Sequence, residues 1–418
     1  MAAVRPVRGT RDYLPADSRR QRFVETTALA IASRYGYGEI STPIFEFTEV
    51  FARTLGDTSD IVTKEMYTLA DRSGESLTLR PENTAGVVRA VISNGLAQQV
   101  PLKYFYRGPM FRYERPQKGR LRQFNQVGIE LLGVAEPGGD IECIALAADF
   151  LSALGLEAIV NLEINTLGDP DSRRTYTERL VGYLEGRRAQ LSEDSRMRLE
   201  RNPLRVLDSK DEGDRAVVAA APSIMDSLNE TSRSFFAAVR AGLDTLDIRY
   251  TINPKLVRGL DYYCHTAFEF TTEALGAQGT VLAGGRYDGL AEQMGGRPLP
   301  GIGWAAGVER AIMLVGDHGG AFPDEPRPLA VVPQSPAQDA AAQRLARELR
   351  RAGLPVDIGY AGSIGKRLKR ANRINARAAI IVGEDELARD RVAVRDLDSG
   401  IQEEVALAAL ADGLVRFL

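Results

Sequence analysis

The sequence predicts an α+β protein of two domains, of which the first contains a helical insertion and the second is of α/β type. Residues 100–134 have the pattern of a long β-hairpin, and residues 173–248 are charge-dense and helical with little strand signal. After residue 328, short apolar strands alternate with helices, as in small α/β domains. The length of 418 residues agrees with two or three domains.

The composition, with 44% hydrophobic and 26% charged residues, excludes collagen-like, disordered and membrane-spanning classes. The net charge is −3, so any nucleic-acid site must be a local basic patch. The only cysteines and histidines are Cys143, Cys264, His265 and His318, which excludes a Cys/His zinc cluster and a disulfide framework. The sequence contains no signal-peptide pattern and no long apolar run, so we expect a cytoplasmic protein without a membrane segment.

The elements of the first domain follow in order along the chain. Apolar residues recur with helical spacing over residues 17–35, and residues 36–46 are typical of a turn and a strand. The hairpin at 100–134 has a polar, basic loop. The stretch 251–315 is Gly-rich and strand-like until its end, where a Gly-containing strand passes into an apolar helix.

Residues 316–328 combine Gly, Pro and acidic residues, as exposed linkers do. We therefore expect one domain over residues 1–325, with its insertion at about 173–248, and a second domain over residues 327–418. The second domain, of about 90 residues, begins with strand, helix, strand, helix and strand, which predicts a largely parallel sheet.

Phosphate-binding loops of common types are incomplete in this sequence. The segment 362–367, GSIGKR, lacks the spacing and the hydroxyl residue of a Walker loop. Gly301, Gly303 and Gly307 form GxGxxxG, but the segment does not open a βαβ unit with a ribose-binding acid. We interpret these glycines as positions of close backbone packing near Trp304.

The predicted hairpin contains the residue types of a phosphate-and-base site. Guanidinium groups bind phosphate oxygens through forked hydrogen bonds, and aromatic rings offer a stacking face. A solvated ribbon with its charges facing water is the alternative, and the segment alone leaves it open. The basic residues are Arg107, Arg112, Arg115, Lys118, Arg120 and Arg122, and the aromatic residues are Tyr104, Tyr106, Phe111, Tyr113 and Phe124.

Two further segments, LVRGLDYY at 256–263 and AGGRYDGL at 283–290, share Gly, Arg, Asp and Tyr. A charged side chain is costly to bury in an apolar strand unless it is paired, so these segments indicate a polar pocket. A structural ion pair is the alternative, which the sequence leaves open. Cys264 and His265 follow the first segment and are interpreted as packing residues.

Six segments occur in an order that is characteristic of one enzyme family. They are RGTRDYLP at 8–15, TLRPENTAG at 78–86, FRYERPQKGRLRQFNQVGIELLG at 111–133, LVRGLDYY at 256–263, AGGRYDGL at 283–290 and GVERAIML at 307–314. FRxE and GxER within them resemble the second and third signature motifs of class II aminoacyl-tRNA synthetases. Over nearly its whole length the chain resembles the histidyl-tRNA synthetases.

This resemblance implies a class II catalytic domain with an antiparallel sheet of six or more strands, a helical insertion and a C-terminal α/β anticodon-binding domain, in a homodimer. It implies that L-histidine and ATP form histidyl-adenylate and pyrophosphate, and that the histidyl group then passes to tRNA(His). Mg²⁺ is expected to accompany ATP, and no side chain is assigned as a metal ligand. We expect no DNA or membrane partner.

By resemblance, Arg112 and Arg258 face the α-phosphate of ATP and are the catalytic residues, because charge grows there in the transition state. Arg310 would bind the γ-phosphate with help from Arg120. The histidine carboxylate is already ionised, so a general base is not needed. The residues matched to ATP are Arg112, Glu114, which would face the adenine amino group, Arg120, Phe124, which would stack on adenine, and Arg310.

Recognition of an imidazole calls for a buried acceptor and a hydroxyl that match its two ring nitrogens. Glu130 and Tyr263 stand at the family positions with this role. Glu82, Thr84 and Gln126 would hold the α-amino and carboxylate groups. The residues matched to histidine are Glu82, Asn83, Thr84, Arg112, Gln126, Glu130, Arg258, Tyr262, Tyr263 and Tyr287.

The segment 364–377 of the second domain is predicted to be a basic helix. In a domain that resembles an anticodon-binding module, its basic face is expected to contact tRNA phosphates, although a solvated face is the commoner role of such charges. The sequence leaves open which element reads the bases. The residues assigned to this face are Lys366, Arg370, Arg373 and Arg377.

Three other interpretations share some of these motifs. A regulatory subunit of ATP phosphoribosyltransferase in histidine biosynthesis resembles the synthetase, but typically lacks the extra arginine and the anticodon domain that this chain keeps. A class II enzyme for threonine, proline or glycine disagrees with LVRGLDYY. An ATP-independent RNA-binding protein would leave the arginines without a phosphate partner.

Overall fold

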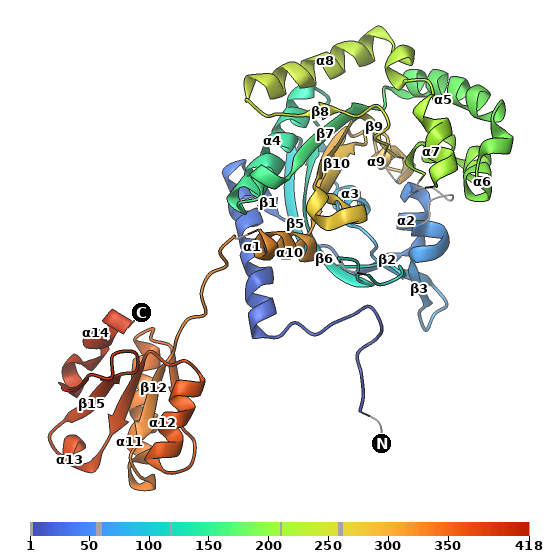
Figure 1. The fold of residues 1–418 in the computed structure, drawn as a ribbon. Helices are drawn as coiled ribbons and strands as arrows, with labels where there is room; N and C mark the ends of the chain where they lie inside the picture. Colours follow the sequence, from blue (N-terminus) through green and yellow to red (C-terminus); the bar gives the residue numbers. More distant parts are fainter. Residues whose placement is uncertain are drawn as a thin grey trace. The chain divides into compact units, whose positions relative to one another are not determined.

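The computed structural model describes residues 3–55, 61–117, 119–209, 211–257, 262–318 and 320–417 (Figure 1). The chain divides into two compact units, Met1–Pro323 and Asp324–Leu418, each with its own hydrophobic core. The division falls inside the stretch 316–328 that the sequence indicates as a linker.

The first unit is built on an eight-stranded sheet. Among the described residues its strands pair in the order β1 (Gly38–Glu39), β5 (Leu102–Phe111), β6 (Gln123–Leu132), β11 (Gly301–Gly307), β10 (Thr280–Arg286), β9 (Cys264–Thr271), β7 (Asn161–Thr166) and β8 (Thr251–Ile252). All inner pairs are antiparallel, which confirms the expected class of sheet. The two-residue edge strands β1 and β8 pair in parallel with their neighbours.

β5 and β6 form the predicted hairpin, in which Leu102 lies opposite Leu132. β6 is buried along most of its length because it lies between β5 and β11. Successive side chains of a strand point to opposite faces, so Phe105 belongs to one core cluster and Tyr106 to another. The hairpin therefore separates two helical layers.

Helices cover both faces of this sheet (Figure 1). The larger core contains residues of α1 (Pro15–Arg34), α4 (Pro137–Ala153), α8 (Glu230–Thr245) and α10 (Val308–Asp317). The smaller core contains residues of α2 (Thr48–Leu55), α3 (Thr84–Ser93) and α9 (Leu290–Gln293), together with several tyrosines. No helix in the described ranges has the length and apolar character needed to cross a bilayer.

The helical insertion has a core of its own, formed by α5 (Pro170–Glu185), α6 (Glu193–Arg201) and α7 (Glu212–Ala219). The sequence analysis placed α8 in this insertion, at 173–248. In the structure α8 packs against α4 and contributes to the larger core instead. An amphipathic pattern identifies a helix but not the core that its apolar face contacts.

A second sheet of the first unit contains β2 (Phe45–Phe47), β4 (Ser76–Leu79) and β3 (Tyr67–Ala70) in that order. The sequence analysis expected one strand within residues 36–46, but the chain forms β1 in one sheet and β2 in the other. Pro43 lies between them and lacks the N–H group that a continuous ladder needs.

The second unit has a five-stranded sheet. Its strands pair in the order β13 (Val356–Ile358), β12 (Leu329–Pro333), β14 (Ala378–Val382), β15 (Arg391–Asp396) and β16 (Gln402–Ala406). The first three are parallel and alternate in sequence with α11 (Asp339–Arg351) and α12 (Ile364–Arg373), as predicted. β15 and β16 form an antiparallel hairpin that the sequence analysis missed, because β16 is an exposed edge strand without an apolar run.

Candidate active site

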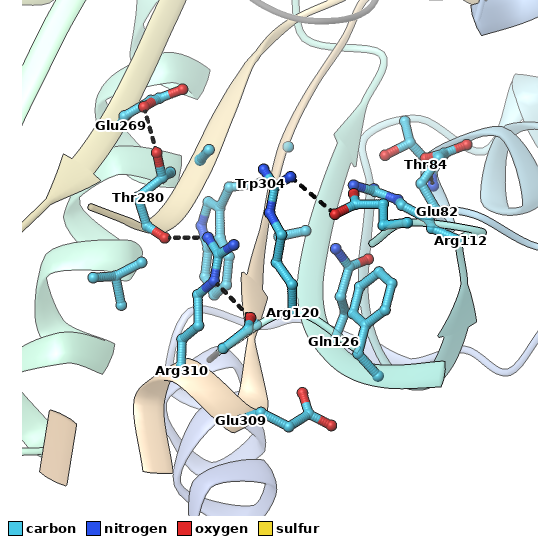
Figure 2. A pocket seen from close by; sticks show the side chains of 18 of the residues that line it. Glu82, Thr84, Arg112, Arg120, Gln126, Glu269, Thr280, Trp304, Glu309 and Arg310 are labelled. Carbon is cyan, nitrogen blue, oxygen red and sulfur yellow. Dashed lines mark hydrogen bonds and ion pairs between the residues drawn. The ribbon is translucent and has the colours of Figure 1, made fainter. Parts of the chain in front are cut away.

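The first unit contains a cavity of about 360 Å³ beside the hairpin (Figure 2). Its walls come from the strands β5, β6, β9, β10 and β11, the β5–β6 loop and the first turns of α3 and α10. Ten of the residues predicted from the sequence line it. They are Glu82, Thr84, Arg112, Glu114, Arg120, Phe124, Gln126, Tyr262, Tyr263 and Arg310.

Three arginines lie along this cavity (Figure 2). Arg310 donates from Nη1 to the carbonyl of Thr280 at 2.6 Å and from Nε to the carbonyl of Gly119 at 3.2 Å. Burial, together with the nearby charges of Arg120 and Arg112, lowers the pKa of Arg310. Guanidinium groups that repel one another can bind a polyphosphate, which removes the repulsion.

Arg112 is fixed by two contacts. Its Nε donates to the carbonyl of Pro81 at 2.9 Å, and its guanidinium lies 5.3 Å from the centroid of the Phe124 ring. Glu114 forms an ion pair with Arg120 at 3.0 Å. The hairpin thus brings a ring, two guanidinium groups and a carboxylate to one cavity, which are the residue types that bind a nucleotide.

Another part of the cavity is acidic and lies at the start of α3 (Figure 2). The Glu82 carboxylate accepts hydrogen bonds from the backbone N–H groups of Thr84 at 2.6 Å and Ala85 at 3.0 Å. These bonds satisfy two donors that the helix start leaves free. Burial raises the pKa of Glu82, while the charge of Arg112 opposes the shift. A carboxylate in this place can accept hydrogen bonds from an ammonium group of a ligand.

Glu130 lies beneath the cavity lining and is 0% exposed. Its carboxylate accepts from the Thr84 hydroxyl at 2.7 Å and from the Tyr287 hydroxyl. Gly303 on β11 is its cross-strand partner, and a Cβ atom there would collide with the Glu130 carboxylate. Burial raises the pKa of Glu130 from 4.5 to about 8, although these hydrogen bonds oppose the shift.

Tyrosines form the wall next to Glu130. The rings of Tyr262 and Tyr263 have centroids 4.6 Å apart, and Tyr262 meets the Tyr287 ring edge-on at 5.7 Å. Tyr106 also lines the cavity, and its buried hydroxyl lies near Thr84 and Glu130 without a hydrogen bond of standard geometry to a described residue. That hydroxyl can bond a polar atom of a ligand. The sequence analysis noted Tyr106 in the hairpin but did not assign it to the site.

The structure gives different outcomes for three further predicted residues. Gln126 lines the cavity, and its Oε1 is buried without a partner in the described part of the chain. Asn83 is buried outside the lining, where its Oδ1 accepts from the Thr42 hydroxyl at 2.6 Å and from Arg80 at 3.2 Å. These bonds tie the start of α3 to the segment before β2. Arg258 lies outside the described residues.

The segment AGGRYDGL contributes a buried ion pair. Arg286 and Asp140 are both 0% exposed and pair with each other, and Arg286 also pairs with Asp288 at 3.0 Å. The carbonyl of Val134 accepts a further bond from Arg286 at 2.9 Å. For Arg286, the structural ion pair that the sequence left open is therefore the arrangement found.

The four basic residues assigned in the second unit do not form one exposed helix face. Arg370 forms an ion pair with Asp357 at 2.8 Å. Arg377 lies beyond the end of α12 and pairs with Asp398 at 2.7 Å. These partners come from neighbouring segments, so the sequence of the helix did not reveal them. The basic residues exposed on α12 are Lys366, Lys369 and Arg373.

Glu309 lines the cavity but was not assigned from the sequence. Its carboxylate accepts from the Tyr13 hydroxyl at 2.5 Å and from the backbone N–H of Asn125 at 2.8 Å. Burial and the Glu309 charge raise the pKa of Tyr13 to about 12. Tyr13 and Glu309 are 296 positions apart, so only the family motifs that contain them could have linked them. Among the described residues, no group of three or more Asp, Glu, His or Cys side chains is arranged to hold a metal ion.

A family model for histidyl-tRNA synthetase matches residues 9–311, and one for an anticodon-binding domain matches residues 329–416. The chain belongs to the histidyl-tRNA synthetase family. It is 65% identical, over 100% of both chains, to the histidine–tRNA ligase of Rhodospirillum rubrum. It is 55% identical, over 98% of both, to that of Gluconacetobacter diazotrophicus. The apo histidyl-tRNA synthetase of S. aureus matches with a TM-score of 0.84 and 36% identity, over 98% of this chain and 99% of that one.

These matches confirm the histidyl-tRNA synthetase resemblance and the fold class expected from the sequence. A structure from Bacillus halodurans, described as an ATP phosphoribosyltransferase regulatory subunit/histidyl-tRNA synthetase, has the same fold, with a TM-score of 0.61 and 22% identity over 88% of this chain and 96% of that one.

We expect the Glu130 carboxyl to make stability depend on pH. Its pKa is raised on folding from 4.5 to about 8, so its contribution is fully present below pH 4.5 and is lost as the pH rises through about 8. Glu130→Gln cannot titrate. The unfolding free energy of the unsubstituted protein relative to Glu130→Gln should therefore fall between pH 5 and 8, by a few kcal/mol as an order of magnitude.

Urea unfolding at several pH values measures this difference. Glu292→Gln, which removes an exposed carboxylate from α9, is the matched control and should change stability little throughout. A difference between the unsubstituted protein and Glu130→Gln that does not vary with pH would contradict the assignment.

Proposed function

We propose that this chain is a cytoplasmic histidine–tRNA ligase. It would activate L-histidine with ATP and then pass the histidyl group to tRNA(His). One observation carries the proposal: a single cavity joins the arginines of the hairpin and α10 to the acidic start of α3, with the buried Glu130 beneath it. Membership of the histidyl-tRNA synthetase family supports it.

In the first step a carboxylate oxygen of histidine forms a bond to the α-phosphorus of ATP, while the bond to the bridging oxygen breaks and pyrophosphate leaves. Arg112 would stabilise the negative charge that grows on the α-phosphoryl oxygens. Arg258, assigned through the family motif alone, would act on the same group. The carboxylate needs no base because it is already ionised.

Three neighbouring groups are proposed to hold the rest of ATP. Arg310 would bind the γ-phosphate, and adenine would stack on Phe124. Glu114 and Arg120, which pair with each other at 3.0 Å, would separate as ATP enters. Arg120 would then turn to the phosphates and Glu114 to the adenine amino group.

The end of the cavity at the start of α3 is proposed to hold histidine. Glu82 would accept hydrogen bonds from the α-ammonium group, with Thr84 and Gln126 beside it. The imidazole would lie against the tyrosine wall, with one ring nitrogen on Glu130 and the other on the Tyr263 hydroxyl. Because burial raises the pKa of Glu130 to about 8, the Glu130 carboxyl can share a proton with a ring nitrogen of histidine. Amino acids without a basic ring have no such nitrogen, so they would bind less well.

In the second step a terminal ribose hydroxyl of the tRNA attacks the carbonyl carbon of the adenylate. An ester bond forms, the bond to the phosphate oxygen breaks, AMP leaves, and the proton of the hydroxyl is released. The exposed residues Lys366 and Arg373 of α12 would bind phosphates of the same tRNA.

Mg²⁺ is proposed to accompany ATP. Glu269 lines the cavity, and Mg²⁺ is commonly bound by one or two carboxylates together with substrate phosphates. Glu269 is therefore the candidate to hold it. When bound, the ion would neutralise part of the phosphate charge.

A regulatory subunit without ligase activity is the alternative function. The anticodon-binding match over residues 329–416 and the arginines of the cavity favour the ligase. Histidine-dependent exchange of pyrophosphate into ATP distinguishes the two, because only the ligase forms an adenylate.

Arg112→Ala should reduce kcat of histidine-dependent pyrophosphate exchange roughly 100-fold or more, the usual scale for losing one group that stabilises transition-state charge. Arg107→Ala is the control, since Arg107 lies on the same hairpin but pairs with Glu39 at 2.9 Å outside the cavity. The control should keep near-normal kcat. An Arg112→Ala protein that is folded and fully active would refute the proposed role.

Lys366→Glu combined with Arg373→Glu should lower kcat/KM for tRNA charging by about tenfold or more, because phosphate attraction is replaced by repulsion. Pyrophosphate exchange should stay unchanged. The control combines Arg344→Glu with Arg347→Glu, two exposed positions on α11. Equal losses in both double variants would mean that general charge, and not the α12 face, attracts the tRNA.

We further propose that the chain forms a homodimer through the sheet β2–β4–β3. Strand register places Phe45, Phe47 and Leu69 on one face, where they are 55%, 51% and 47% exposed. The opposite face buries the polar Thr78, which is 0% exposed. A sheet normally turns its apolar face inward, so this reversal favours burial of the exposed face against a second copy.

Phe45→Glu combined with Phe47→Glu should shift a dimer to monomers, because four carboxylates would be buried without partners in each dimer interface. Light scattering with size-exclusion chromatography measures the mass. Met197→Glu, at a position in α6 that is 48% exposed, is the control and should leave the mass unchanged. A double variant that keeps the dimer mass at micromolar concentration would exclude this face as the interface.

A further inference from the structure

Tyr262 and Tyr263 separate two hollows. Both residues line the cavity described above, and both also line a second hollow of about 500 Å³. The second hollow is bounded by α5 of the helical insertion and by Asp288, Gly289 and Gln293. The wall of the proposed histidine pocket is therefore one residue layer thick. Its other side faces the second hollow, which α5 of the insertion lines.

A side chain of the insertion holds this wall. Arg173, in the first turn of α5, donates from Nη1 to the carbonyl of Tyr263 at 2.9 Å. Arg173 as a whole is half-buried, and Tyr263 is 7% exposed. Buried backbone carbonyls need a donor, and here an arginine side chain supplies it from another module.

The backbone next to Tyr263 is held by the segment that directly precedes α5. The N–H of Leu167 donates to the carbonyl of His265 at 2.6 Å, and the N–H of His265 donates to the carbonyl of Gly168 at 2.8 Å. His265 has φ 43°, a left-handed conformation that needs such support in a residue other than glycine. Its ring stacks on Phe235 with centroids 4.5 Å apart, in agreement with the packing role expected from the sequence.

α5 belongs to the separate core of the insertion through Tyr176, Leu180 and Leu184. Val257, which precedes the tyrosine segment, packs against both this core and the core beneath the cavity. A shift of the insertion would therefore move Arg173 and Val257 together, and with them the backbone that carries the tyrosines.

We infer that Arg173 is a positioning residue for histidine: it holds the Tyr263 backbone so that the tyrosine ring meets the imidazole. The inference rests on the proposed function. Arg173 itself does not line the cavity and is assigned no contact with substrate. Its effect should therefore appear in the binding of histidine and not in that of ATP.

The test is pyrophosphate exchange by the full chain with Arg173→Met and Arg173→Lys. Methionine keeps much of the stem but removes the donors, so KM for histidine should rise about tenfold while KM for ATP stays within about twofold. Lysine keeps one donor group and should recover part of the loss. Arg174→Met is the matched control, because Arg174 is the next residue and pairs with the exposed Asp171.

An unchanged KM for histidine in Arg173→Met would overturn the inference. So would an equal rise in both KM values together with a lower Tm, which would indicate a general structural role. The absence of exchange in the unsubstituted protein would instead refute the proposed function. Calorimetric titration of histidine into Arg173→Met and the unsubstituted protein would then still test the positioning role, since binding does not require turnover.

Discussion

The burial of the Glu130 carboxyl is the constraint on which the site depends. A carboxyl group removed from water is destabilising by several kcal/mol unless its oxygens are hydrogen-bonded. Its partners are the Thr84 hydroxyl at the start of α3 and the Tyr287 hydroxyl after β10, and Gly303 on β11 leaves the space that it occupies. The start of α3, the segment after β10 and strand β11 lie apart in sequence. All three must therefore pack against Glu130 on β6 before the cavity can form.

The same convergence fixes the other end of the cavity. β11 passes directly into α10, so the register that places Gly303 over Glu130 also sets the position of Arg310. Glu309, its neighbour, ties Tyr13 to the backbone of Asn125 on β6. The two ends of the cavity are thus held at a constant separation by the paired strands β6 and β11, which a reaction between two bound substrates requires.

The hairpin, the insertion and the alternating strands and helices of the second unit could be predicted because each depends on a local pattern. Partners from distant segments could not. Asn83 was matched to histidine through a family motif, and the bond that its side chain accepts from Thr42, 41 positions away, could not be foreseen. The interpretation of Arg286 stayed open because Asp140 is 146 positions away. The ten predicted residues that line the cavity were identified through family motifs and not through periodicity, since no local pattern specifies which side chains meet there.

The arginines of this chain differ in the groups to which they donate. Arg286 is matched by two carboxylates, so its charge is neutralised within the fold. Arg310 and Arg112 donate to backbone carbonyls, which orient a guanidinium group without cancelling its charge. A partly buried cation of this second kind is stabilised further when an anion arrives. The partner of each arginine, more than the motif around it, therefore separates a residue that maintains the fold from one that is prepared for a phosphate.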